Sequence, residues 1–168
     1  FRFKALPESA QREFINRIVK GEKLDIDEEA IQAIINIAEG DLRKVANLLQ
    51  AAAAISKKIT ADIVYDVASR AKPREVEEML NLALKGDVQS FQKAREILHK
   101  KLIVEGLAGE DLIKEIYRQA LKLNIPEDKK IELIEKIGEY EFRISEGGDA
   151  LIQLTALLAQ IALIGKKK

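Results

Sequence analysis

The stretch from Gly40 to Gln50 reads Gly-Asp-Leu-Arg-Lys-Val-Ala-Asn-Leu-Leu-Gln, and the chain on either side is organised around it. Glycine has no Cβ atom and can adopt the left-handed conformation that ends a helix. An aspartate can cap the free N–H groups of the helix that follows. Gly40-Asp41 therefore predicts a tight joint between two helices, the second of which carries Leu42 and Arg43 in its first turn.

Arg43 is the candidate functional residue of this stretch. The first turn of a helix has unpaired N–H groups and the positive end of the helix dipole, both of which favour an anion. A guanidinium placed there could bind a phosphate through two parallel hydrogen bonds. Gly86-Asp87 and Gly148-Asp149 predict the same joint without an arginine, so Gly-Asp alone marks a helix break in this chain. The alternative for Arg43 is an exposed helix cation with no ligand.

Helical periodicity continues through the rest of the sequence, which is predicted to be all-α. A strand-like alternation is present only in Phe1-Arg2-Phe3-Lys4, which is typical of a strand end or an extended segment. The segment from Ser69 to Pro73 is polar, and a residue before proline is disfavoured in a helix. We therefore place a domain boundary near Lys72, with a four-helix unit in residues 1–71 and five helices in residues 72–168.

The last predicted helix, from Asp149 to Ile164, is apolar on all sides. Such a helix must be covered on all sides, and a second subunit could cover the face that a small domain leaves open. The alternative is a central core helix that needs no partner. The residues predicted to form an oligomer interface are Leu151, Leu154, Leu158 and Ile161.

The composition limits the classes of function. The chain has 168 residues, of which 33% are charged, and its 28 basic and 28 acidic side chains give a net charge of zero. This balance argues against a protein that binds nucleic acid mainly through charge. A helical DNA-binding module remains an alternative, and it would use three local clusters of lysine: Lys57-Lys58, Lys100-Lys101 and the tail from Lys166 to Lys168.

The residue types available also exclude several kinds of site. The sequence has no cysteine and a single histidine, His99, so it cannot form a disulfide, a thiolate zinc site or a multi-histidine metal site. It has no phosphate-binding glycine loop and no nucleophile elbow. We therefore predict no catalytic site and no metal in this chain. With no signal peptide and no apolar run long enough to span a bilayer, we expect a soluble cytoplasmic protein that does not contact membranes.

The order of several motifs resembles a known family. The chain is similar to the C-terminal part of archaeal replication factor C small subunits, which are sliding-clamp loaders of the AAA+ class, and the resemblance covers essentially the whole sequence. The segments that carry it are Phe1 to Phe3, Glu39 to Lys44 continuing to Ala52, Ala83 to Gly86, Leu107 to Asp111, Phe142 to Gly147, Ile152 to Leu154, and Leu163 to Lys168.

The resemblance implies roles for both units. Residues 1–71 would be the helical lid of the AAA+ ATPase, and residues 72–168 the collar that holds the subunits in a ring. Arg43 matches the sensor 2 arginine, which reaches the ATP phosphates from the lid, and Leu42 would pack near the adenine. The collar role agrees with the apolar last helix.

The resemblance also implies what lies outside this sequence. Because the chain begins with Phe1, we expect a fragment or a processed chain that lacks the ATPase domain with its phosphate loop and Mg²⁺-binding acids. ATP and Mg²⁺ would belong to the intact parent, so the fragment is expected to hold no cofactor and not to hydrolyse ATP. The implied partners are further copies through the collar, the replication factor C large subunit, and the sliding clamp and primer-template DNA through the missing domain. The alternative is a helical DNA-binding or scaffold module without a nucleotide role.

Overall fold

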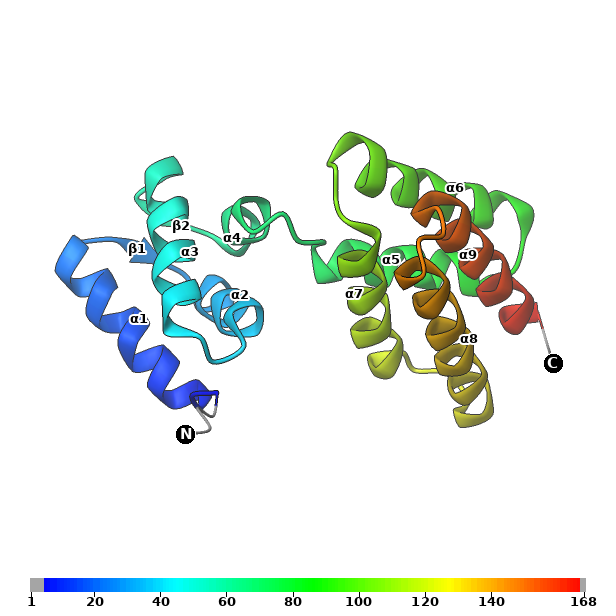
Figure 1. The fold of residues 1–168 in the computed structure, drawn as a ribbon, viewed down its shortest axis with the longest axis horizontal. Helices are drawn as coiled ribbons and strands as arrows, with labels where there is room; N and C mark the ends of the chain where they lie inside the picture. Colours follow the sequence, from blue (N-terminus) through cyan, green and yellow to red (C-terminus); the bar gives the residue numbers. More distant parts are fainter. Residues whose placement is uncertain (1–4, 167–168) are drawn as a thin grey trace. The chain divides into compact units, whose positions relative to one another are not determined.

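The computed structural model describes residues 5–166, so the expectations for Phe1-Arg2-Phe3-Lys4 and for Lys167 and Lys168 fall outside the described part of the chain. Nearly all regular structure in that part is helical, which confirms the all-α prediction. The chain divides into two compact units, Phe1–Arg70 and Ala71–Lys168, and each is described by itself (Figure 1).

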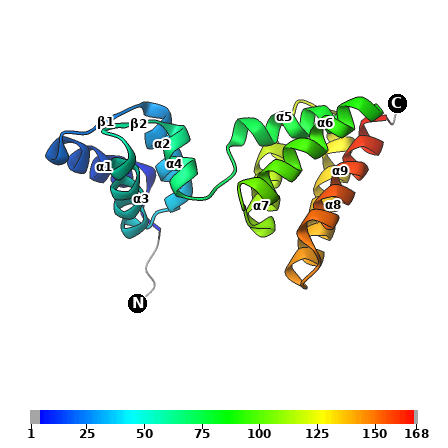
Figure 2. The same ribbon diagram turned by 90° about the horizontal axis from the view of Figure 1, so that it is seen from above.

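Over residues 5–70, which the structure describes, the first unit is a bundle of four helices, which can also be followed in Figure 2. They are α1 (Glu8–Glu22), α2 (Glu28–Ala38), α3 (Leu42–Ile55) and α4 (Ala61–Val67). Helix α2 packs against each of the other three, and α3 also packs against α1 and α4. The apolar stripe of α2 lies at the centre of the unit, because Ala30, Ile34 and Ala38 have almost no exposed surface. The buried core of this unit consists of Ile15, Ala30, Ile31, Ala33, Ile34, Ile35, Ala38, Val45, Leu49, Ala52, Ile59 and Val64.

Two short strands, which the sequence did not predict, pair two loops of the first unit with each other. Strand β1 (Asp25–Ile26) pairs in parallel with β2 (Lys58–Ile59). The Asp25 N–H donates to the carbonyl of Lys57 at 2.9 Å. Because each strand has only two residues, it is too short to show the alternation by which a strand is recognised in a sequence. Lys57-Lys58 is therefore part of a paired segment as well as a polar break between helices.

Over residues 71–166, which the structure describes, the second unit contains five α-helices and one π-helical turn. Pro73 starts its first helix at a position where the missing N–H is not needed, and Asp87 caps the next helix by accepting from the N–H of Ser90 at 2.8 Å. Ala71, which the sequence assigned to the first region, is buried in the core of this unit. The elements are α5 (Pro73–Leu84), α6 (Val88–His99), η1 (Lys100–Val104), α7 (Gly109–Lys122), α8 (Glu127–Ser145) and α9 (Ala150–Lys166).

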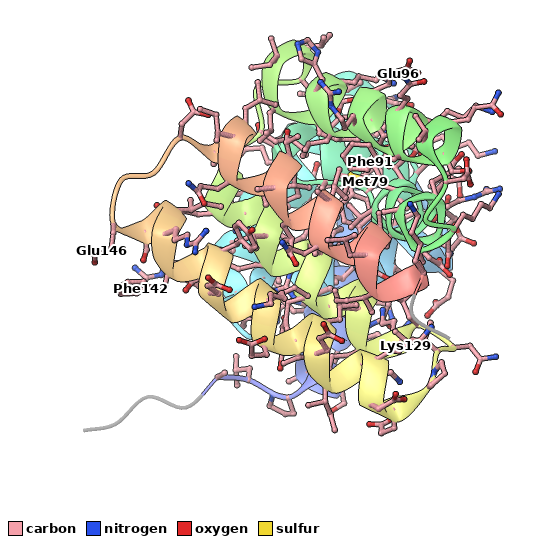
Figure 3. All side chains as sticks on the ribbon, turned by 90° about the vertical axis from the view of Figure 1, so that its right-hand side faces the viewer. Met79, Phe91, Glu96, Lys129, Phe142 and Glu146 are labelled. Carbon is pink, nitrogen blue, oxygen red and sulfur yellow. The ribbon has the colours of Figure 1, made fainter. Side chains whose placement is uncertain are left out.

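Helix α9 packs against α5, α6, α7 and α8. Its backbone approaches α5 closely at Gly165, where a Cβ atom would lie 1.9 Å from the carbonyl oxygen of Leu84. No side chain larger than hydrogen fits there without a shift of one helix. In Figure 3, α8 and α9 run side by side across the front of the unit, with Phe142 and Glu146 near the end of α8.

The helix that begins at Val88 does not stop where α6 ends but continues as the π-helix η1. Within η1, Lys101 is almost completely buried, with 2% of its side chain exposed. Its ammonium group donates to Glu75 on α5 and to both carboxylate oxygens of Glu105, at 2.9 and 2.7 Å. A buried ammonium needs such partners because removing an unpaired charge from water is costly.

Candidate functional site

The joint between α2 and α3 has the backbone that the sequence predicts. Glu39 and Gly40 both have positive φ angles, of 51° and 89°, which turn the chain after Ala38. A Cβ atom on Gly40 would lie 2.7 Å from Ala5 Cβ and 2.7 Å from the Leu6 nitrogen. Glycine is therefore required here both by the backbone conformation and by the segment that leads into α1.

A buried glutamine ties that segment to the joint. The Gln11 amide group donates from Nε2 to the carbonyl of Leu6 at 3.1 Å, and Gln11 Oε1 accepts from the Gly40 N–H at 3.1 Å. The Leu6 N–H in turn donates to the carbonyl of Gly40 at 3.3 Å. Only 4% of Gln11 is exposed. Sequence reasoning missed Gln11, although it lies one helical turn before Ile15 and so on the buried face of α1.

The cap of α3 changes the expectation for an anion at this helix end. Asp41 Oδ1 accepts from the Arg43 N–H at 2.8 Å and from the Lys44 N–H at 3.4 Å. A carboxylate already occupies these amides and offsets the positive end of the helix dipole. Any attraction of a phosphate to this end therefore depends mainly on the Arg43 side chain.

Arg43 and Leu42 lie in different environments. Arg43 is exposed, and within the described part of the chain its side chain has no hydrogen-bond or ion-pair partner. Its guanidinium is therefore available to a ligand from outside the chain. Leu42 is half-buried and packs against the core of the first unit, so it stabilises the start of α3.

The predicted interface residues on α9 need a correction. Leu154, Leu158 and Ile161 have no exposed surface, because they lie in the core of their own unit. A side chain without exposed surface cannot contact a second subunit, so the interface prediction is wrong for these three residues. Leu151 is half-buried.

Other apolar residues near α9 are exposed instead. Ile152 is 66% exposed and Leu163 is 53% exposed. Leu163 is eleven positions after Ile152, which is close to three full helical turns, so both lie on one face of α9. Phe142, near the end of α8, is 63% exposed and points away from the unit in Figure 3.

The lysine clusters proposed for DNA binding are only partly available. Lys57, Lys58 and Lys100 are exposed, as is Lys166. Lys101 is buried in its ion pairs, so it cannot contact a phosphate backbone. The alternative of a DNA-binding module loses one of its predicted contacts.

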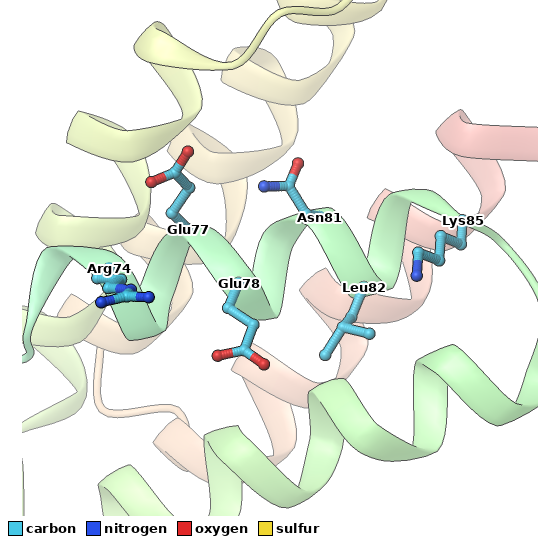
Figure 4. Close-up of a pocket in the computed structure, with 6 residues that line it drawn as sticks. All are labelled: Arg74, Glu77, Glu78, Asn81, Leu82 and Lys85. Carbon is cyan, nitrogen blue, oxygen red and sulfur yellow. The ribbon is translucent and has the colours of Figure 1, made fainter.

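An open pocket of about 510 Å³ lies along α5 (Figure 4). Its lining has two charged residues of each sign and comes from α5 and its C-cap residue Lys85, so no second helix places a chemical group opposite these side chains. The lining residues are Arg74, Glu77, Glu78, Asn81, Leu82 and Lys85. This surface is a mixed-charge helix face with no arrangement that indicates catalysis.

Two further features bear on possible sites. Residues 5–166 contain no group of three or more His, Cys, Asp or Glu side chains that could hold a metal ion. Among the helices of this described part, none is long and apolar enough to cross a membrane.

Fold and site together define a two-unit helical protein. In its described part, the first unit presents the exposed Arg43 at the start of α3, and the second unit is built around the apolar helix α9. Residues 71–160 match the family model of the replication factor C C-terminal domain. This match covers more than half of the chain. The chain therefore belongs to the replication factor C family.

Curated relatives agree with this family over the whole chain. A protein of Pyrococcus furiosus named "Replication factor C small subunit" is 50% identical over 167 residues, which are 99% of this chain and 19% of the relative. A protein of the same name from Sulfurisphaera tokodaii is 44% identical over 169 residues, which are 99% of this chain and 50% of the relative. A third, from Archaeoglobus fulgidus, is 38% identical over 167 residues and is matched over 51% of its length. The chain thus spans from about a fifth to about half of the length of these relatives.

Proposed function

We propose that this chain is the C-terminal portion of a clamp-loader small subunit, in which the first unit acts on nucleotide and the second holds subunits together. The observation that carries the proposal is the alignment of both units, 99% of the chain, with relatives named replication factor C small subunit. The whole assembly would load the sliding clamp onto primer-template DNA. Its contacts with the clamp, with DNA and with the large subunit would involve parts of the protein beyond this chain.

The proposed nucleotide role rests on Arg43. Its exposed guanidinium is without a side-chain partner in the described structure and could form two hydrogen bonds with an ATP phosphate. ATP and Mg²⁺ would be held by residues outside this chain, since the described residues offer no cluster of metal ligands. We therefore expect no ATP hydrolysis by this chain alone.

The experiment for this role is ATP binding by the intact subunit with Arg43→Ala. Hydrogen bonds to a charged group contribute about 1.5–3 kcal/mol, so the affinity should fall by about 10-fold or more. Lys44→Ala is the matched control, because Lys44 is also exposed and its N–H also donates to Asp41. Equal affinities for the Arg43→Ala variant and the native subunit would refute the role.

The proposed assembly surface is the exposed face of α9 that carries Ile152 and Leu163. Burying these side chains against another copy would remove apolar surface from water, which favours association. Further copies of the subunit are the proposed occupants, and the large subunit would take the same position in a mixed ring.

Light scattering of the 168-residue chain over a concentration series tests this surface. We expect a discrete oligomer, and we expect the double variant Ile152→Glu/Leu163→Glu to be monomeric with unchanged helix content. Leu121→Glu is the control, because it places the same charge on an exposed apolar position of α7. A native chain that stays monomeric at every concentration would show that α9 does not drive assembly.

A further inference from the structure

Three hydrogen bonds connect the start of the described chain to the joint that carries Arg43. Gln11 bridges the Leu6 carbonyl and the Gly40 N–H, and Leu6 and Gly40 are bonded directly through their own backbones. The joint thus contacts the segment before α1 through both backbone and side chain.

Because of these hydrogen bonds, the segment before α1 and the joint at Gly40 cannot easily move independently of each other. Gln11 has 4% of its surface exposed, so water cannot replace its two hydrogen bonds without opening the unit. At Gly40 the space beside the backbone is occupied by Ala5 and the Leu6 nitrogen, where a Cβ atom would be only 2.7 Å away. A displacement of Leu6 must therefore either break these contacts or move the joint with it.

The joint in turn determines where Arg43 lies. Arg43 follows Gly40 by three residues, and its N–H is held by Asp41, which caps α3. The direction of the first turn of α3, and with it the base of the Arg43 side chain, is therefore fixed relative to Leu6.

We propose that Gln11 is a positioning residue for Arg43, which transmits the position of the segment leading into α1 to the guanidinium at the start of α3. This inference rests on the proposed role of Arg43 in nucleotide binding. It adds that the nucleotide contact responds to movement of the chain before α1, since that segment and the joint form one hydrogen-bonded unit.

A double-mutant cycle on ATP binding by the intact subunit tests the inference. Gln11→Leu removes both hydrogen bonds, and we expect an affinity loss of about 3- to 10-fold, because the guanidinium is still present but no longer held in one direction. In the Arg43→Ala background, Gln11→Leu should cause no further loss, since Gln11 acts through Arg43. Gln50→Leu on α3 is the matched control, because Gln50 is exposed.

A second variant keeps the test valid if Gln11→Leu loses helix content. Gln11→Glu retains the acceptor for the Gly40 N–H but loses the donor to Leu6, and the same cycle applies with a smaller expected loss. Losses that add fully to those of Arg43→Ala, or no loss in either Gln11 variant, would overturn the positioning role and leave the role of Arg43 intact. If Arg43→Ala itself has no effect on ATP affinity, the proposed function fails, and this inference fails with it.

Discussion

Replacing Lys101 by methionine should destabilise the second unit, because it removes the charge that two carboxylates depend on. The methionine side chain would retain most of the apolar contacts of the buried lysine stem. Glu75 and Glu105 would then face each other without the ammonium group that both now contact. Their like charges would repel, and their hydrogen bonds would be lost.

The size of the effect follows from the exposure of the three groups. Lys101 is 2% exposed, whereas the side chains of Glu75 and Glu105 are 35% and 33% exposed. Each charge-assisted hydrogen bond contributes about 1.5–3 kcal/mol, but water can rehydrate carboxylates that are one-third exposed. We therefore expect the free energy of unfolding to fall by about 1–3 kcal/mol. For a unit of this size, each kcal/mol lowers the melting temperature by about 4–8 °C.

The assay is denaturant unfolding of the chain at pH 7, followed by circular dichroism. Lys100→Met is the matched control, because the side chain of Lys100 is 60% exposed and lies 3.7 Å from Glu105. It should change the stability by less than about 0.5 kcal/mol. The reasoning is refuted if Lys101→Met unfolds at the same denaturant concentration as the native chain, or at a higher one.

Three further variants test the backbone and the caps. Gly165→Ala should destabilise the second unit by about 1–3 kcal/mol, because the new Cβ atom would overlap the Leu84 carbonyl. Thermal unfolding of this variant should therefore show a lower melting temperature than that of the native chain. Gly40→Ala should destabilise the first unit by about 1 kcal/mol or more, since the φ angle of Gly40 is 89° and Ala5 and Leu6 fill the space that a Cβ atom would need. Unchanged denaturant unfolding of this variant would contradict the prediction. The pKa of Asp87 is lowered chiefly by the hydrogen bond from the Ser90 N–H. The stabilisation by this cap is therefore present above the ordinary aspartate pKa of about 3.9, and it is lost as the pH falls through the lower pKa of Asp87 in the folded chain. Asp87→Ala should therefore be less stable than the native chain at pH 7, with a difference that shrinks below pH 4 in unfolding experiments.

Local sequence patterns predicted the helices and their joints, because those depend on residues that are close in sequence. Asp27 caps α2 through the Ala30 N–H at 2.7 Å, and Asp41 caps α3, as expected from their positions before apolar stripes. Arg43 was likewise found in the first turn of α3, as predicted.

What the sequence could not predict depends on contacts between distant elements. The apolar character of α9 indicates that it is covered, but not that Leu154 and Leu158 face its own unit while Ile152 stays exposed. Lys101 looked equivalent to Lys100, yet it follows Leu98 by three residues and continues the buried face of α6, which is the signal that could have separated them. The hydrogen bond from the Gly40 N–H to Gln11 joins residues 29 positions apart, so only the fold could reveal it.

The paired strands β1 and β2 also affect the behaviour of the chain in concentrated solution. Exposed strand edges can recruit further chains and start aggregation, and very short edges are one way in which proteins avoid this. With two residues in each strand, this pair offers too few free backbone groups for another strand to add. The pair β1–β2 thus joins two loops of the first unit by backbone pairing without itself providing a template for fibril growth.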